Sequence, residues 1–433
     1  MSDKSKPAQV PKLRFPEFQQ AGEWTTEKLG SLVSISTEKV GNNNCVPMSI
    51  TSGVGLVSQE DKFGRVIAGD SYKNYLLLKP FDFAYNKSAT KEYPEGFLTL
   101  YNGVKLAAVP NSIFTCFRVN GTSPYPPYLK YLFAGNLHGQ WLRKFIQVGA
   151  RAHGSLSIND GDLLALPVPL PSGQSSLKEQ QKIADCLSSL DELIAAQARK
   201  VDSLKTHKKG LMQQLFPREV ETQPRLRLPE FRDAREWEET KLGDYFDPIR
   251  NGFVGTATPY YTTSEGVRYL QGRNIKQGRI EADNLIFITS DFHNRQRKSH
   301  LKTGDILMVQ SGHVGECAVV GPDFAGANCH ALVILTPRRK LSSEFFRHYF
   351  YAPIGELAIF QITTGNTIKH ILASELKTLP VFVPGLAEQH RIADCLNSLD
   401  TLITAATQEL ETFKTHKKGL MQQIFPSAEA VEA

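Results

Sequence analysis

The sequence lacks the features that would place the protein in a membrane or in a secretory pathway. None of its apolar runs reaches the roughly 20 residues that a membrane span needs, and the polar start MSDKSKPAQV has no apolar signal-peptide core. The six cysteines are Cys45, Cys116, Cys186, Cys317, Cys329 and Cys395. Because no two of them form a CxxC pair, neither a zinc site nor a disulfide framework is indicated. We therefore expect a cytoplasmic protein with reduced thiols.

A strong charge imbalance is also missing. The 50 Lys and Arg residues exceed the 44 Asp and Glu residues by only six, which permits an acidic partner such as nucleic acid without requiring one. The 433 residues are too many for one ordinary core and suit two domains with connectors.

Motifs of catalysis are nearly absent. Tyr125-Pro126-Pro127-Tyr128 resembles the loop with which amino-methyltransferases hold a flipped base, but its first position has no amide or carboxylate acceptor, so a helix start is favoured. Pro322-Asp323 has no following acidic-x-Lys for a nuclease metal site, and no Gly-rich phosphate loop occurs. His207 and His416 have no companions at metal-ligand spacing. We expect a chain without catalysis, metal or cofactor of its own.

What the sequence does contain is an internal repeat. Residues 183–217, IADCLSSLDELIAAQARKVDSLKTHKKGLMQQLFP, match residues 392–426, IADCLNSLDTLITAATQELETFKTHKKGLMQQIFP, without a gap. A second pair is PKLRFPEFQQAGEWTTEKLG (11–30) and PRLRLPEFRDAREWEETKLG (224–243). The regions between these pairs keep their order but differ in sequence. The chain is therefore a tandem duplication, and its divergent parts suit either two modules that recognise different targets or neutral drift.

The repeated segments at 175–216 and 385–425 are expected to be helices. Their apolar residues follow a heptad series, with polar residues such as Gln197, Lys208 and Lys417 in its gaps. Ser176 with Glu179 predicts a capping box, and Gly385 with Glu388 a weaker one. Each helix of about 39 residues would be ~58 Å long. So narrow an apolar stripe predicts an antiparallel coiled coil related by a pseudo-twofold axis.

The predicted fold consists of α/β (α+β) modules with mostly antiparallel sheets, joined by the two antiparallel helices in a near-circular arrangement. Along the chain we expect a disordered tail (1–10), a first module (11–174), the first helix (175–216), a linker (217–223), a second module (224–384), the second helix (385–425) and a tail (426–433). In this arrangement, the segment 11–30 should lie near the end of the second helix.

The repeated LRFPEF…EW…KLG opening, the LP-V-P-LP…EQQKIADCLSSLD entry and the THKKGLMQQLFP exit resemble the specificity subunit of type I restriction-modification enzymes. The resemblance spans residues 11–426. It implies two target-recognition domains, each of which reads one half of a split, asymmetric DNA site, while the antiparallel helices fix the spacing.

The resemblance also implies partners. Two methyltransferase subunits would dock on the helical region and modules, and motor-nuclease subunits would join them for restriction. Those subunits would carry out adenine methylation with S-adenosylmethionine, and ATP-driven, Mg-dependent cleavage. This chain would supply only the DNA sequence specificity.

Polar side chains on matching loops of the two modules are the candidate DNA contacts, because Arg pairs with guanine and Asn or Gln with adenine in the major groove. In the first module they are Tyr85, Asn86, Lys87, Lys91, Arg151 and His153. In the second module they are Arg273, Asn274, Gln310, Ser311, His313, Thr364, Asn366, Lys369 and His370. The charge cluster Arg295, Arg297 and Lys298 suits phosphates better than bases.

The KTHKKG copies indicate a requirement that both halves share. Docking of two copies of one partner is the preferred interpretation, with contact to the DNA backbone and a plain coiled-coil framework as alternatives. The candidate docking residues are Lys208, Lys209, Gln213, Lys417, Lys418 and Gln422. For the whole chain, an unrecognised fused methyltransferase and a coiled-coil adaptor that binds only proteins remain alternatives to DNA recognition.

Overall fold

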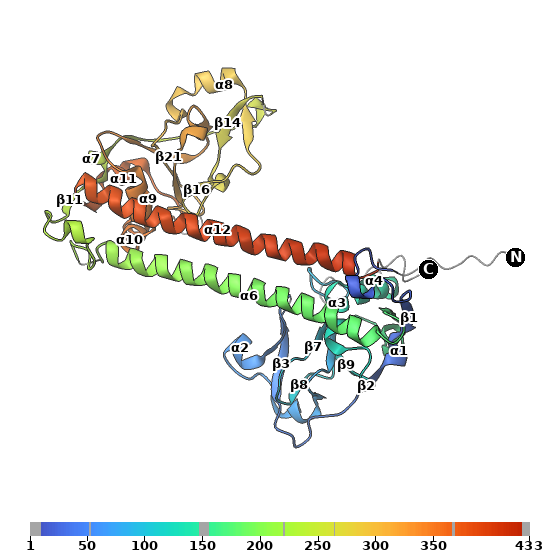
Figure 1. Ribbon diagram of the computed structural model, residues 1–433. Helices are drawn as coiled ribbons and strands as arrows, with labels where there is room; N and C mark the ends of the chain where they lie inside the picture. The colour runs from blue at the N-terminus through green and yellow to red at the C-terminus, as the bar shows by residue number, and fades with distance from the viewer. Residues whose placement is uncertain are drawn as a thin grey trace. The chain divides into compact units, whose positions relative to one another are not determined.

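A computed structural model describes residues 10–51, 53–146, 156–219, 221–263, 265–365 and 369–426 (Figure 1). The chain divides into two compact units. Unit 1 contains the residues up to Gln197 and those from Glu409 onward, and unit 2 contains Ala198–Gln408. Each unit therefore combines one module with parts of both long helices. No helix among the described residues is long and apolar enough to cross a membrane.

The two long helices have the predicted extents. Helix α6 covers Ser176–Leu215 and helix α12 covers Leu386–Ile424. In unit 1, Lys417 donates to Asp191 and Gln197 donates to Glu409. Residues later in α6 therefore contact residues earlier in α12. The helices therefore run antiparallel, as predicted.

The predicted capping boxes are wrong. The Ser176 hydroxyl donates to the carbonyl oxygen of Pro171, at 2.5 Å. The Glu179 carboxylate instead accepts two hydrogen bonds from Arg14, both 2.7 Å long, and one from the Trp24 indole at 3.3 Å. A carboxylate engaged by a guanidinium and an indole is not free to cap the helix. Glu179 therefore joins the segment 11–30 to the start of α6.

Unit 2 repeats this contact at the start of α12. The Glu388 carboxylate accepts hydrogen bonds from Arg227 at 2.9 and 2.6 Å and from the Trp237 indole at 3.3 Å. We call each such trio, Arg14–Trp24–Glu179 and Arg227–Trp237–Glu388, a carboxylate clamp. The repeated residues LR, EW and E thus serve one structural purpose twice.

Two matching hydrogen bonds join the opening segment of each module to the end of a long helix. In unit 2, the Leu226 amide donates to the Gln214 carbonyl near the end of α6. In unit 1, the Leu13 amide donates to the Gln423 carbonyl near the end of α12, although the two residues lie at opposite ends of the sequence. The segment 11–30 thus lies near the end of the second helix, as predicted.

The described residues of the first module form three sheets. Their orders are β1-β10, β2-β9-β6-β7 and β4-β3-β8-β5, and the β3–β8 pair is parallel whereas the other strand pairs of these sheets are antiparallel. The strands are β1 (Thr25–Lys28), β2 (Val33–Ser36), β3 (Val46–Thr51), β4 (Gly55–Ser58), β5 (Leu76–Leu78), β6 (Phe83–Asn86), β7 (Phe97–Leu100), β8 (Ala107–Val109), β9 (Phe114–Val119) and β10 (Pro167–Leu170). The short helices are α1 (Leu29–Leu32), α2 (Gln59–Phe63), α3 (Pro126–Ala134), α4 (Leu137–Leu142) and α5 (Asp160–Leu164).

The second module repeats this plan and adds a hairpin. In its described residues the sheets are β11-β22, β12-β21-β18-β19, β13-β17-β14-β20 and the hairpin β15-β16, and the β14–β20 pair is parallel. The strands are β11 (Glu238–Lys241), β12 (Phe246–Asn251), β13 (Tyr261–Thr262), β14 (Val267–Leu270), β15 (Ile275–Lys276), β16 (Arg279–Ile280), β17 (Ile286–Ile288), β18 (Ile306–Val309), β19 (Cys317–Val319), β20 (Asn328–Cys329), β21 (Leu332–Pro337) and β22 (Pro380–Val383). The helices are α7 (Leu242–Tyr245), α8 (Ser290–Arg295), α9 (Ser343–Tyr351), α10 (Pro353–Gln361) and α11 (Ala373–Thr378).

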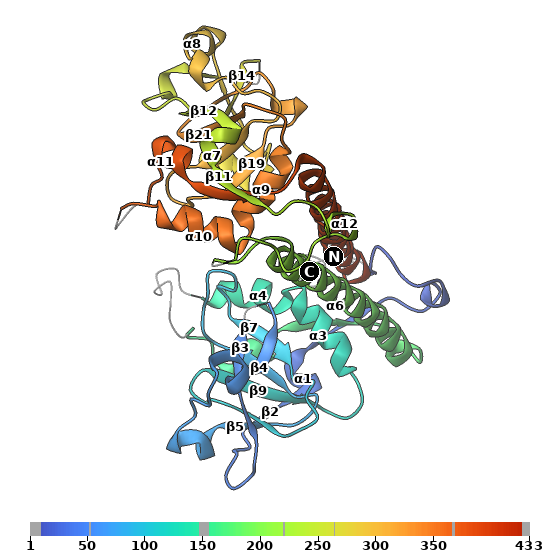
Figure 2. The ribbon, with the colours of Figure 1, turned by 90° about the vertical axis from the view of Figure 1, so that its left-hand side faces the viewer.

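Each module shares its core with the long helices. In unit 1, helix α3 lies between α6 and the strands (Figure 2). The hydrophobic core of the first module includes Ile183 of α6 and Phe425, which follows α12. In unit 2, the core around α9 extends to Phe216 beyond α6 and Ile392 of α12. A module and its helix ends therefore share one apolar cluster, which ties the position of the module to the helices of its own unit.

Candidate nucleic-acid interface

Two of the predicted loops of the second module lie side by side. The loop between β18 and β19 carries Gln310, Ser311 and His313, and the loop after α10 carries Thr364, Lys369 and His370. Ser311 and His370 form an isolated antiparallel bridge, as do Thr364 and His370. The Ile371 amide donates to the Gln310 carbonyl at 3.1 Å. We call this pair of loops, 310–315 with 364–365 and 369–370, the loop corner.

The loop corner offers polar side chains to solvent. His313, Thr364, Lys369 and His370 are exposed, and Gln310 and Ser311 are half-buried. A cavity of about 390 Å³ lies beside it, lined by residues that include His313, Lys369, Glu356 and Phe360. The ring of Phe360 is 64% exposed, and the Lys369 ammonium lies 5.4 Å from its centre. Asn366 falls outside the described residues.

The first module has a matching backbone hydrogen bond. Lys87 follows β6 as Gln310 follows β18, and the Leu156 amide donates to the Lys87 carbonyl at 2.7 Å. Arg151 and His153 lie outside the described residues. Lys87 pairs with Asp160 at 3.3 Å, and Lys91 is exposed.

Three predicted DNA contacts are contradicted by their burial. Tyr85 is fully buried, and its hydroxyl donates to the Glu95 carbonyl at 2.7 Å. Asn86 is also buried, and its side-chain oxygen accepts the Ser88 amide. Asn274 caps the turn at Gln271 and donates to the Glu281 carbonyl. Because their polar groups already have partners inside the module, none of the three is placed to read a base.

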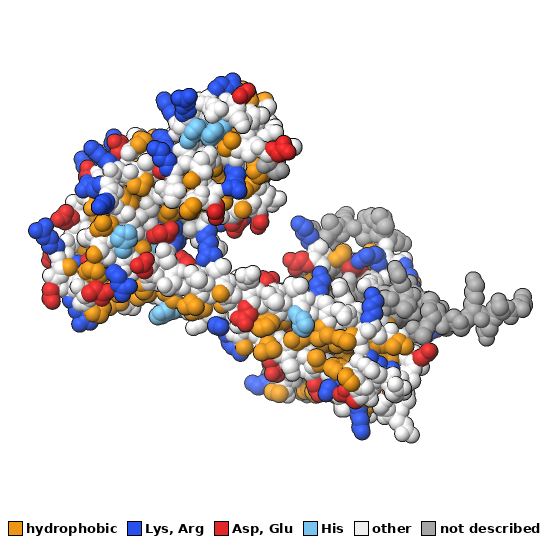
Figure 3. All heavy atoms as spheres, turned by 45° about the horizontal axis from the view of Figure 1, so that its top comes forward, with side chains coloured by type: hydrophobic (Ala, Val, Ile, Leu, Met, Phe, Trp, Pro, Cys, Tyr) orange, Lys and Arg blue, Asp and Glu red, His pale blue; other side chains and the backbone are white. Residues whose placement is uncertain are grey.

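The remaining basic candidates lie on another part of the second module. Arg295, Arg297 and Lys298 follow one another through α8 and the turn after it, and all three are exposed. Arg273 is exposed too and donates to the Asn284 carbonyl at 3.1 Å. Figure 3 shows Lys and Arg side chains at the outer end of this module, around a histidine patch. This basic surface suits phosphates, which need charge more than exact geometry.

The predicted docking residues divide into two groups. Lys209, Gln213, Lys418 and Gln422 are exposed on the helices. Lys208 instead bonds Asp400 on α12 at 2.5 Å, and Lys417 bonds Asp191 on α6, with both lysine side chains only 18% exposed. Burial lowers the pKa of Lys208, while the Asp400 carboxylate opposes this change. These internal ion pairs give Lys208 and Lys417 a structural reason to be repeated, so the two lysines are not among the docking residues proposed below.

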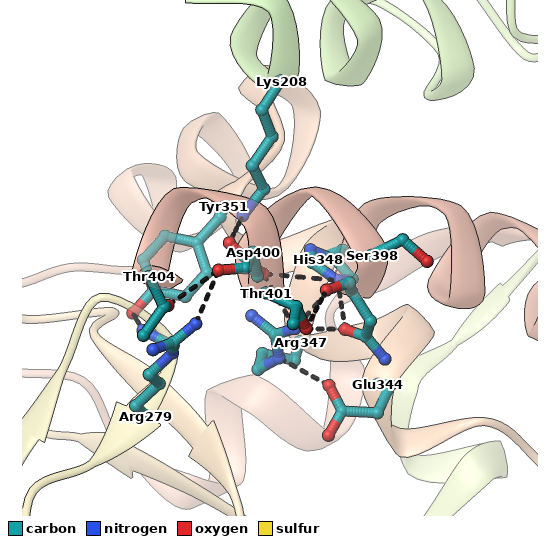
Figure 4. A network of polar contacts seen from close by, with 12 residues as sticks. Lys208, Arg279, Glu344, Arg347, His348, Tyr351, Ser398, Asp400, Thr401 and Thr404 are labelled. Atoms are coloured by element: carbon teal, nitrogen blue, oxygen red, sulfur yellow. Dashed lines mark hydrogen bonds and ion pairs between the residues drawn. The ribbon is translucent and has the colours of Figure 1, made fainter. Parts of the chain in front are cut away.

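Each of these aspartates also contacts its module. In unit 2, the Arg347 guanidinium lies 3.3 Å from Asp400 and also donates to Asn397 (Figure 4). In unit 1, the Tyr131 hydroxyl donates to Asp191 at 2.9 Å. Asp191 and Asp400 occupy the same place in the two repeated helices. The sequence interpretation missed both residues, although the repeated SLD triplet was a usable signal.

The segments that resembled catalytic motifs have structural roles. Pro126 and Pro127 form the first turn of α3, as predicted, and the buried Tyr128 hydroxyl donates to the Pro169 carbonyl. Pro322 and Asp323 belong to a short 3-10 turn. Within the described ranges, no cluster of three His, Cys, Asp or Glu residues is arranged to hold a metal ion.

Comparisons with known proteins agree on one class. The family model of the type I restriction modification DNA specificity domain matches residues 234–412. A Methanocaldococcus jannaschii protein, assigned as the specificity subunit of the type I restriction enzyme MjaX, is 28% identical over 329 residues, which are 75% of this chain and 73% of the relative. The MjaVIII specificity subunit of the same organism is 26% identical over 267 residues, or 59% of this chain and 60% of the relative.

The fold has a counterpart among solved structures. The crystal structure of the type I restriction-modification S subunit from M. genitalium matches with a TM-score of 0.57 at 15% identity, covering 96% of this chain and 99% of the other. This likeness shows that the two chains share a fold over nearly their whole length.

Proposed function

We propose that the chain is a specificity subunit of the type I restriction-modification family and that it recognises DNA for a complex whose chemistry resides in other subunits, since the matched family model is a DNA specificity domain and the curated relatives are named as such subunits. The alternative of a coiled-coil adaptor without DNA recognition has no support, since the matched domain is a DNA specificity domain. We place this role in the cytoplasm, where the DNA lies.

The observation that carries the proposal is a pair of matching backbone hydrogen bonds at the same point of two modules whose loops carry different side chains. In the first module the Leu156 amide donates to the Lys87 carbonyl, and in the second module the Ile371 amide donates to the Gln310 carbonyl. A shared scaffold that presents different polar groups is suited to two different half-sites. The target would then be bipartite and asymmetric.

The contacts divide by chemistry. Gln310, Ser311, His313, Thr364, Lys369 and His370 are the proposed base-edge contacts of the second module, with Asn366 as a further sequence-based candidate. In the first module, Lys87 and Lys91 take this role, and Arg151 and His153 stay predictions. Arg273, Arg295, Arg297 and Lys298 would bind phosphates, since clustered positive charge gives affinity without sequence information.

The helices would set the separation of the two half-sites and hold the partners. At 1.5 Å per residue, each is about 60 Å long. Two methyltransferase subunits would dock on the repeated exposed residues Lys209 with Gln213 and Lys418 with Gln422. Motor-nuclease subunits would join them, and S-adenosylmethionine, ATP and Mg would be bound by these partners.

Methylation mapping tests the proposal. DNA from a host that expresses the methyltransferase subunit would be sequenced by a method that detects modified adenine, with and without this chain. We expect a motif of two short halves around a fixed gap only when the chain is present. Methylation that does not depend on the chain would refute the proposal.

A further inference from the structure

A carboxylate and a phenol hold the base of the loop 310–315. Glu316 closes this loop, because its carbonyl accepts the Val309 amide at 2.8 Å. The Tyr351 hydroxyl, at the end of α9, donates to the Glu316 carboxylate at 2.7 Å. Burial raises the pKa of Tyr351 well above its ordinary value, so the hydroxyl keeps its proton and remains a donor.

The same two side chains accept hydrogen bonds from the turn of the hairpin β15–β16. The Gln277 amide donates to the Glu316 carboxylate at 2.9 Å, and the Gly278 amide donates to the Tyr351 hydroxyl at 2.8 Å. Gln277 and Gly278 both have positive φ, 49° and 81°, as a two-residue hairpin turn of this kind requires. We call Glu316, Tyr351 and this turn the clasp.

The clasp is connected to the long helices of unit 2. A Cβ atom on Gly278 would lie 2.4 Å from an Arg347 guanidinium nitrogen, so the turn packs directly on Arg347. Arg279, the next residue, donates to the Asp400 carbonyl at 2.9 Å, and Arg347 reaches the Asp400 carboxylate (Figure 4). Because Asp400 also pairs with Lys208, polar contacts run from both helices to the base of the loop.

Among the described residues of the first module there is no such clasp. By the strand registers, Phe97 takes the place of Glu316, and by the alignment of α3 with α9, Ala134 takes the place of Tyr351. There the loop between β6 and β7 is braced by Tyr93 against Phe97, whose rings lie 4.6 Å apart. The Asp–Lys pairs of the helices are repeated in both units, whereas the clasp is not. The clasp therefore belongs to what distinguishes the two modules.

We propose that Glu316 and Tyr351 are positioning residues that fix the loop 310–315 in the geometry with which the second module reads its half-site. The proposal rests on the proposed DNA recognition and names a part of it. Bidentate contacts between side chains and base edges discriminate only if the side chains are held in place. A loop that is held before binding also loses less conformational entropy when it meets the DNA.

Two conservative variants test the clasp in the full complex with the methyltransferase subunit. Tyr351→Phe keeps the ring and removes the hydroxyl, and Glu316→Gln keeps the shape and removes the charge. Tyr245→Phe, in α7 of the same module and outside the clasp, is the matched control. Tyr93→Phe provides the corresponding change beside the loop of the first module.

Methylation mapping is the readout, scored at each position of the motif. We expect both clasp variants to lower discrimination against single-base changes in the second half-site by about tenfold, the effect of losing one strong hydrogen bond. The first half-site and the gap should stay unchanged, and Tyr245→Phe should behave as the parent chain.

The other outcomes are decisive as well. An unaltered motif with both clasp variants would overturn the clasp proposal while the DNA-recognition role stands. Equal loss of methylation at all sites by a complex whose thermal unfolding matches the parent would also overturn it, since the clasp would then not act on one half-site. Failure of the parent chain to direct methylation would instead refute the proposed function itself.

Discussion

The carboxylate clamp of unit 2 allows a quantitative prediction of stability. Arg227 and Glu388 meet through two hydrogen bonds, and their side chains are only 13% and 3% exposed. Glu388→Gln removes the charge and leaves the Arg227 guanidinium buried without a counter-ion. Removal of one partner from a buried ion pair costs about 3–5 kcal/mol, and the slight exposure of Arg227 favours the lower end. We therefore expect the free energy of unfolding to fall by about 3 kcal/mol.

The assay is denaturant unfolding of the full chain, with amide hydrogen exchange to locate the effect. Exchange should increase around residues 226–239 and the start of α12. Glu179→Gln is the matched variant, which should have the same effect around residues 13–26 and the start of α6. The double variant Arg227→Met with Glu388→Met should cost much less than Glu388→Gln, because it leaves no unpaired charge. A loss below about 1 kcal/mol for Glu388→Gln would refute the claim that this pair is a buried, stabilising contact.

Three further predictions follow from the ionisable groups. Lys208→Met should lower the free energy of unfolding by about 1–2 kcal/mol because it breaks the ion pair with Asp400. Lys209 is exposed, so Lys209→Met should change the free energy of unfolding by less than about 0.5 kcal/mol, and urea titration of both variants compares the two values. Burial lowers the pKa of His138 to about 4, so the stability that the neutral imidazole contributes should be complete above about pH 6.5 and be lost as the pH falls toward 4. Thermal unfolding of His138→Phe across this range should depend less on pH than that of the parent chain, and an unchanged pH profile would contradict this. Arg297→Ala with Lys298→Ala should weaken DNA binding equally for all sequences and reduce the slope of log K against log salt by about 2; an effect confined to one sequence would contradict a phosphate role.

The repeat made much of the architecture predictable. Two copies of a heptad-patterned segment can bury their stripes on each other, and the polar residues in the gaps now have partners, Gln197 with Glu409 and Lys208 with Asp400. The position of the segment 11–30 was also predictable, because the order of the repeated segments requires the N-terminal copy to complete the module at the end of the second helix.

The partners of individual side chains were not predictable to the same degree. Glu179 lies three residues after Ser176, which is the spacing of a capping box. Its carboxylate instead accepts two hydrogen bonds from the buried guanidinium of Arg14. Tyr85 precedes polar Asn86 and Lys87 and so suggested a surface loop. It is the third residue of strand β6, whose residues are all buried, so tertiary packing decides its position.

The clasp left no signal in the sequence. Glu316 and Tyr351 are 35 residues apart, and neither is repeated in the first module, where Phe97 and Ala134 stand instead. Contacts that distinguish one module from the other are, by their nature, invisible to a comparison of the two halves. They become visible only when the structure brings the end of α9 against the base of the loop.

A module substitution tests the central claim, that each module reads its own half of a bipartite site, most directly. Residues 224–384 would be replaced by residues 11–174, and the methylation motif of the complex would be mapped beside that of the parent chain. The account predicts that the first half-site appears twice in inverted orientation around an unchanged gap, because two equal modules on antiparallel helices would present one recognition surface twice. A motif that keeps two different halves would contradict the account.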